Sequence, residues 1–138
     1  MVVKLNDVWV EQMRIETMTS SERKADRVLR EMRSRYWHAL PQRAYRMRRL
    51  IQKDRAGRLE PGELEELELL AKRLADLGST YDFEEVAHIA ARVCDLLAAH
   101  RDGGVDHAAL LQTCDELDTF IDDMTIEALA LRLRAAFS

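Results

Sequence analysis

The stretch Lys72–Phe83, KRLADLGSTYDF, lies near the middle of the chain and decides its fold. Leucines spaced three or four residues apart lead into it, and this spacing is typical of one face of an α-helix. The small residues Gly78–Thr80 then interrupt the pattern. Asp82, with Glu85 three residues later, forms a capping box typical of a helix N-terminus. The stretch therefore predicts the end of one helix, a tight turn and the start of the next.

A long helical pattern precedes this stretch and is divided by a proline. The segment Thr19–Glu22, rich in hydroxyl groups, predicts a helix start, and apolar residues recur at helical spacing from Ala25 to Leu40. Pro41 lacks an amide hydrogen and disfavours helical geometry in the residue before it. We therefore expect the helix to break or kink at Leu40 and a second helix to begin at Pro41 or Gln42. The second helix should end near Gly57, because glycine readily adopts the left-handed conformation that terminates helices.

Helical periodicity continues along the rest of the chain. Pro61 suits the first turn of the helix that leads into the central stretch. Asp102–Gly104 predicts a turn, and Asp106 predicts the cap of a last helix that continues, or restarts after Thr125. Amphipathic helices joined by short turns bury their apolar faces best against one another. We predict an all-α fold in which residues 19–138 form an antiparallel four-helix bundle.

Residues 1–18 are predicted to form a separate N-terminal appendage. Their valines are compatible with two short strands that turn at Asn6–Asp7. Alternatively, Leu5, Val8 and Met13 lie on one face of a short helix. A lone hairpin has little to pair with in a helical chain, so we favour the helix.

Length and composition bound the class of protein. A chain of 138 residues can bury a core as one domain, and its 5 glycines and 2 prolines leave little room for turns. No apolar run approaches the roughly 20 residues of a membrane-spanning helix. The two cysteines, Cys94 and Cys114, fall on apolar helix faces, which indicates free thiols in a reducing compartment. We therefore expect a cytoplasmic protein that has no membrane partner.

The charges are divided between two halves of the chain. Residues 21–58 hold 13 Lys and Arg against 4 Asp and Glu, whereas residues 59–138 hold 6 against 18. Such asymmetry is typical of a surface that binds a polyanion, of helices that neutralise each other, or of docking on charged partners. The predicted basic surface comprises Arg43, Arg46, Arg49 and Lys53. It lacks a helix-turn-helix pattern and interleaved aromatic residues, so binding of nucleic acid or an acidic protein is kept only as an alternative function.

The central stretch resembles the signature of histidine phosphotransfer (HPt) domains, the phosphorelay carriers of two-component signalling. That signature runs His-x-Leu-x-Gly-Ser-x-x-x-(Tyr/Phe)-Gly-Phe. Leu29–Pro41 is similar to the entry helix of the family, Glu63–Leu77 to the helix that carries the active histidine, and Glu85–Leu97 to the helix after it. The resemblance covers residues 25–124 and implies a four-helix bundle in a bacterial-type signalling pathway.

The same resemblance places Lys72 where the family has its phospho-accepting histidine, and Asp76 where it has a glycine. A lysine side chain is protonated near pH 7 and is a poor nucleophile. Asp76 adds bulk and negative charge where a phosphate would sit. The resemblance therefore implies a pseudo-phosphotransferase, not an enzyme. We expect it to bind a receiver domain or a histidine kinase through Lys72, Arg73 and Asp76 without carrying phosphate.

A second hypothesis keeps phosphate transfer but moves it to another histidine. His88 is expected on the exposed side of its helix, beside Arg92 and Asp95, and would be the displaced phospho-acceptor. No glycine stands four residues after it. No histidine pair has a zinc-ligand spacing together with the cysteines, so we expect no metal, and we expect no cofactor.

Overall fold

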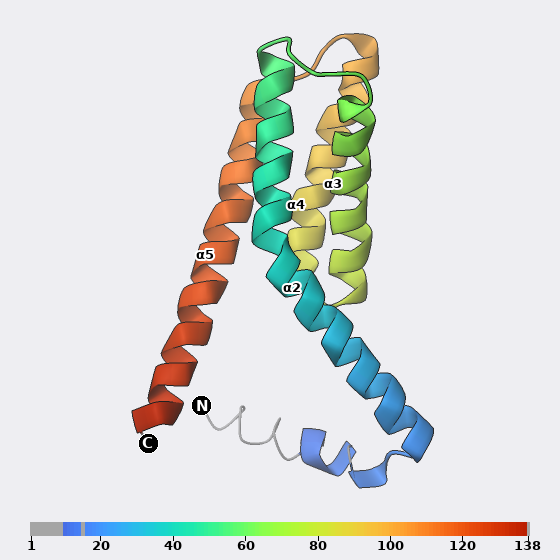
Figure 1. The fold of residues 1–138 in the computed structure, drawn as a ribbon, viewed down its shortest axis with the longest axis vertical. Coiled ribbons are helices and arrows are strands. Elements are labelled where there is room, and N and C mark those ends of the chain that lie inside the picture. Colours follow the sequence, from blue (N-terminus) through green and yellow to red (C-terminus); the bar gives the residue numbers. More distant parts are fainter. Residues whose placement is uncertain (1–9, 15, 138) are drawn as a thin grey trace. The chain divides into compact units, whose positions relative to one another are not determined.

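The computed structural model describes residues 10–14 and 16–137, and the all-α prediction is confirmed there, because no strand occurs among these residues. Residues 10–14 and 16–17 are helical, in agreement with the helix favoured for the N-terminal appendage. The expectations for residues 1–9 lie outside the described residues. The longer elements are α2 (Ser20–Arg55), α3 (Glu63–Thr80), α4 (Glu84–Ala98), the 3-10 helix η1 (Ala99–Asp102) and α5 (His107–Phe137) (Figure 1).

The chain divides into two compact units that meet inside α2, one ending at Arg35 and the other beginning at Tyr36. The start of α2 belongs to the first unit and forms the predicted cap. The amide of Glu22 donates to Thr19 Oγ1 at 3.2 Å, and the amide of Thr19 donates to a carboxylate oxygen of Glu22 at 3.4 Å. This reciprocal pair satisfies two amides that a helix start leaves without an intrahelical partner.

The second unit is built around one hydrophobic core to which α2, α3, α4 and α5 all contribute. The buried residues recur at three- and four-residue spacing, so each helix presents an apolar face to the core. Cys94 and Cys114 are free thiols, as expected from the sequence. None of the helices described is long and apolar enough to cross a membrane. The largest fully buried side chains include Leu40, Met47, Leu50, Ile51, Leu67, Leu74, Val86, Val93, Leu97, Leu110 and Leu117.

Of the two alternatives expected at Leu40, the break with a second helix is wrong, because α2 is continuous and contains Pro41. Pro41 is exposed, while Leu40 and Ala44 beside it are buried in the core. A proline inside a helix removes one hydrogen bond and costs about 3 kcal/mol. Burial of the neighbouring apolar side chains offsets this cost, and such a tertiary contribution lies outside local sequence rules.

The turn between α3 and α4 also differs from the expected capping box. Helix α3 continues through Gly78, and Asp82 adopts a left-handed φ of 63°. The residue before α4 is Phe83, and no side chain caps that helix. Instead, the Phe83 amide donates to the Gly78 carbonyl at 2.7 Å and closes the turn. The cap expected for α5 is confirmed, because Asp106 accepts a hydrogen bond from the Ala109 amide at 3.0 Å.

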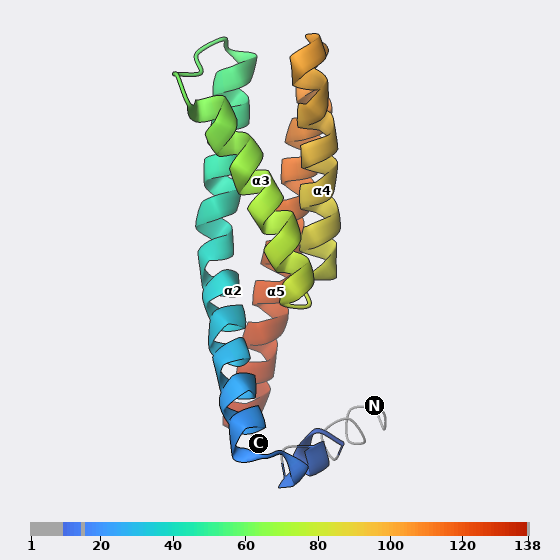
Figure 2. The same ribbon diagram turned by 90° about the vertical axis from the view of Figure 1, so that its right-hand side faces the viewer.

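Gly78 allows a close approach between α3 and α4, which lie side by side (Figure 2). A Cβ atom at this position would lie 3.1 Å from the Ala87 amide nitrogen and 3.0 Å from the Tyr36 hydroxyl oxygen. That hydroxyl donates a hydrogen bond to the Leu74 carbonyl at 2.9 Å. Burial raises the pKa of Tyr36 to about 12, which keeps the hydroxyl protonated and able to donate.

The aromatic residues of the central stretch pack against α2. The ring of Phe83 stacks on Tyr36 and on Trp37, with centroid distances of 5.3 and 5.8 Å. The ring of Tyr81 lies 5.8 Å from that of Tyr36. Aromatic pairs of this kind contribute about 0.5–1.5 kcal/mol beyond the area that they bury. The central stretch therefore joins α2, α3 and α4 at one end of the core.

Candidate functional site

The outward face of α3 carries the partner-binding residues predicted from the sequence. Lys72, Arg73 and Asp76 are all exposed, whereas Leu74 is buried. Leu69, one turn earlier, is an apolar side chain that is 47% exposed. The helical period of 3.6 residues produces this division between an inner and an outer face. We call the exposed set Leu69, Lys72, Arg73 and Asp76 the α3 ridge.

A hollow lies on each side of the α3 ridge. The hollow toward α2 has a volume of about 370 Å³, and Leu69, Leu70 and Leu77 line it together with Arg43 and Arg73. The hollow toward α4 has a volume of about 440 Å³ and is lined in part by Lys72 and Cys94. An apolar floor with a charged rim is the usual composition of a protein–protein interface. The ridge and its hollows thus suit the binding of another protein surface.

The α3 ridge offers binding groups rather than an activated nucleophile. Its closest thiol is Cys94, and burial, followed by the carboxylates of Asp95 and Asp76, raises the pKa of that thiol. A protonated thiol is neither a good nucleophile nor a metal ligand. The α3 ridge therefore offers two cations, one carboxylate and one apolar side chain for contact with a partner.

The predicted basic surface is partly neutralised within the second unit. Arg46 donates two hydrogen bonds to Glu66, at 2.7 and 2.9 Å. Lys53 Nζ lies 3.0 and 3.1 Å from the two carboxylate oxygens of Glu63. Both pairs join α2 to α3. Two members of the predicted surface make no ion pair with any described side chain: Arg43 and Arg49.

A further basic residue of α2 is held by α5 in the same way. Arg48 donates to Asp115 and Asp118 at 2.7 and 2.6 Å. The basic half of the chain thus pairs with the acidic half, which is one of the three interpretations of the charge asymmetry. Pairing of this kind leaves fewer cations for contacts with phosphate groups, and such contacts dominate nucleic-acid affinity.

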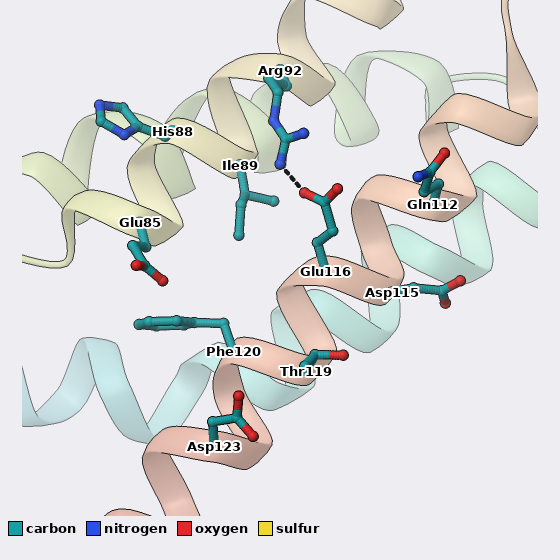
Figure 3. Close-up of a pocket in the computed structure, with 10 residues that line it drawn as sticks. All are labelled: Glu85, His88, Ile89, Arg92, Gln112, Asp115, Glu116, Thr119, Phe120 and Asp123. Carbon is teal, nitrogen blue, oxygen red and sulfur yellow. Dashed lines mark hydrogen bonds and ion pairs between the residues drawn. The ribbon is translucent and has the colours of Figure 1, made fainter.

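A groove between α4 and α5, of about 580 Å³, has His88 at its rim (Figure 3). His88 is exposed, as expected, and its ring points away from Phe120. Ile89 and Phe120 supply apolar surface, and Arg92 forms an ion pair with Glu116 across the groove. Four carboxylates line this α4/α5 groove: Glu85, Asp115, Glu116 and Asp123. Glu85 and Asp123, which form no ion pair with a described side chain, disfavour the approach of an anionic phosphoryl donor to His88.

Asp54, which the sequence did not single out, joins three elements at the end of α2. It accepts hydrogen bonds from His100 Nε2 of η1 at 3.0 Å and from His107 Nε2 of α5 at 2.7 Å. A carboxylate can only accept, so each ring presents an N–H to it. Burial alone would raise the pKa of Asp54, but the two histidine hydrogen bonds outweigh it and lower this pKa below its usual value of 3.8.

We expect Asp54→Asn to lower the free energy of unfolding, by an amount that shrinks in acid. The lowered pKa means that the ionised carboxylate stabilises the fold fully above about pH 4, and that this stabilisation is lost as the pH falls through the folded-state pKa. Urea unfolding of both proteins between about pH 7 and pH 3 measures the difference. Asp122→Asn, at an exposed residue, is the matched control and should track the wild-type protein. A constant difference between Asp54→Asn and wild type at every pH would contradict this role.

No group of three or more described His, Cys, Asp or Glu residues is arranged to hold a metal ion. The comparisons with known proteins do not identify a family: no family model, no curated protein and no solved structure matches the chain. Inference about function therefore rests on the α3 ridge, the α4/α5 groove and the sequence.

Proposed function

We propose that the chain is a degenerate HPt-type domain that binds a receiver domain or a histidine kinase in a two-component pathway without carrying phosphate. One observation carries the proposal: in the central stretch, the residues that match the signature face inward, and the two replacements at the reactive positions face outward. Its inward residues Leu74, Tyr81 and Phe83 match the family signature and are buried. Its outward residues Lys72 and Asp76 depart from the signature at the two positions that phosphate transfer needs.

The arrangement of the helices agrees with the same proposal. The second half of α2 shares one core with α3, α4 and α5, and the connections between consecutive helices are short. Short connections favour antiparallel neighbours, as in an antiparallel four-helix bundle. In this proposal the bundle is the phosphotransfer-type scaffold, and the helical residues before it are an N-terminal extension.

The α3 ridge supplies groups that suit docking on a receiver domain. A receiver presents an acidic pocket around its phosphorylated aspartate, and the cations of Lys72 and Arg73 complement that charge. The exposed side chain of Leu69 offers an apolar contact beside them. Asp76 occupies the place of a small glycine, which limits close approach and suits binding without transfer.

Charge reversal on the ridge tests this proposal. We expect the double substitution Lys72→Glu and Arg73→Glu to weaken binding to a cognate receiver domain at least tenfold, which corresponds to about 1.4 kcal/mol. Isothermal titration of a panel of purified receiver domains and histidine-kinase domains from the source organism measures the dissociation constants. Because both side chains are exposed, the variant should fold normally, and circular dichroism checks this.

Two matched controls separate the ridge from other surfaces. Arg49→Glu reverses an exposed arginine on α2, and His88→Gln removes the alternative phospho-acceptor; both should bind as the wild-type chain does. If no receiver or kinase domain binds, or if the ridge variant binds as well as the controls do, the proposed function is wrong.

A further inference from the structure

The last part of α5 exposes a large amount of apolar surface. We call residues 126–137 the α5 tail. Five of its large apolar side chains are more than half exposed, and Phe137 is 88% exposed. They are Ile126, Leu129, Leu131, Leu133 and Phe137. A helix that is apolar on most sides is normally covered by another element, because exposed apolar surface is unfavourable in water.

The α5 tail continues the same helix face that lines the α4/α5 groove. Along α5, the groove residues Gln112, Glu116, Thr119 and Asp123 are spaced by four and three residues. The series continues without interruption through Ile126, Ala130, Leu133 and Phe137. Residues with this alternating spacing form one stripe along a helix, as in coiled-coil seams. One stripe is therefore polar and acidic in its first half and apolar in its second half.

The charges of α5 are also divided along its length. All six of its acidic residues lie between Asp115 and Glu127, and its two basic residues, Arg132 and Arg134, lie in the α5 tail. Of the four carboxylates in the α4/α5 groove, Asp115 and Glu116 pair with Arg48 and Arg92, whereas Glu85 and Asp123 form no ion pair with a described side chain. An antiparallel pairing of two such helices brings the basic tail of each against the acidic groove of the other. A parallel pairing would place like charges together.

We propose that two copies of this chain associate through α5, antiparallel, with the α5 tail of each copy lying in the α4/α5 groove of the other. The apolar tail side chains then cover the half-buried Phe120, while Arg132 and Arg134 meet the carboxylates at the groove rim. The contact is the same in both directions, so the dimer is closed and leaves no unpaired end.

The dimensions of the two surfaces agree. At a rise of 1.5 Å per residue, the α5 wall of the groove from Gln112 to Asp123 is about 16 Å long. The α5 tail from Ile126 to Phe137 is about 16 Å long on the same basis. The dimer contact involves α4 and α5, whereas the α3 ridge lies on α3 and is not part of it. The dimer therefore does not depend on the proposed function of the ridge.

The first test measures the mass of the full chain in solution. Sedimentation velocity at about 10–100 µM should show a dimer, since a micromolar dissociation constant populates it in that range. Leu133→Asp, at an exposed position, should shift the protein to a monomer with an unchanged circular dichroism spectrum. Lys72→Glu with Arg73→Glu should remain dimeric. A monomeric wild-type chain would overturn the proposal. The same holds if the monomer binds phosphatidylcholine vesicles or a different protein through the α5 tail.

A charge exchange between two variants tests the antiparallel geometry. One variant carries Arg132→Glu and Arg134→Glu, so that tail and groove are both acidic. The other carries Glu85→Lys and Asp123→Lys, so that its groove becomes basic like its tail. Neither variant should dimerise alone. An equimolar mixture should form a 1:1 dimer, because each tail then meets a groove of opposite charge.

Two results of the exchange would overturn the proposal. One is a mixture that stays monomeric although wild type dimerises. The other is a dimer of either variant alone that is as stable as that of the wild-type chain. In both cases α5 would not pair as described.

Discussion

Gly78→Leu is expected to destabilise the second unit by about 3 kcal/mol, the upper part of the range for overpacked cores. Even a Cβ atom at this position would lie 3.1 Å from the Ala87 amide nitrogen and 3.3 Å from the Ala87 Cα, both backbone atoms that cannot rotate away. The larger leucine would push α3 from α4 and disturb the Tyr36 hydroxyl that binds the Leu74 carbonyl. Urea unfolding followed by circular dichroism measures the loss.

A second glycine provides the matched control for this substitution. Gly104 lies in the turn before α5, and no atom lies within 4 Å of a Cβ built on it. Gly104→Leu should therefore change the free energy of unfolding by less than about 0.5 kcal/mol. Gly78→Ala should fall between the two leucine variants. Equal stability of Gly78→Leu and Gly104→Leu would mean that the close approach of α3 and α4 does not exist in solution.

In the proposed phosphotransfer-type scaffold, restoring the family's residues at positions 72 and 76 should create phosphate acceptance, which we expect the wild-type chain to lack. The double substitution Lys72→His and Asp76→Gly places an imidazole on the α3 ridge and removes the carboxylate one turn away. The neutral imidazole nitrogen can take the phosphoryl group from a receiver aspartyl phosphate, breaking the acyl P–O bond and forming an N–P bond. Radiolabelled phosphate from a phosphorylated receiver should then appear on the variant as an acid-labile, alkali-stable label.

The controls for this gain of function are the wild-type chain and the same double variant with His88→Gln. The wild-type chain should stay unlabelled, and the His88→Gln change should not reduce labelling of the variant. Labelling of the wild-type chain that disappears with His88→Gln alone would favour the displaced phospho-acceptor. An unlabelled double variant, tested against receivers that bind it, would argue that the ridge does not have phosphotransfer geometry.

Much of the helical order could be predicted from periodicity and caps. The start of α2 at Thr19–Glu22, the cap at Asp106 and the left-handed Gly57 with a φ of 68° all follow local rules. The helix break expected at Leu40 and the cap expected at Asp82 are wrong for one reason. Both were inferred from local propensity, and in both places packing of buried neighbours determines the backbone instead.

The exposure of the side chains on α3 could also be predicted, because the periodicity of a single helix determines which residues face outward. The outward positions Lys72 and Arg73 follow directly from the buried Leu74 beside them. The pairing of Arg48 with α5, the Asp54 contacts to two histidines and the α4/α5 groove could not be predicted. Each joins residues that are distant in sequence, and periodicity within one helix does not report which helices become neighbours.

The most direct test of the proposed function is to map a bound receiver domain onto the backbone amides of the chain by nuclear magnetic resonance. Titration of the ¹⁵N-labelled chain with a receiver that binds it should shift the amides of residues 68–77 of α3 and those around Arg43. The amides of the α4/α5 groove should stay unchanged at a fixed chain concentration. Shifts confined to the groove, or to the basic residues of α2 away from α3, would contradict a phosphotransfer-type docking surface at Lys72.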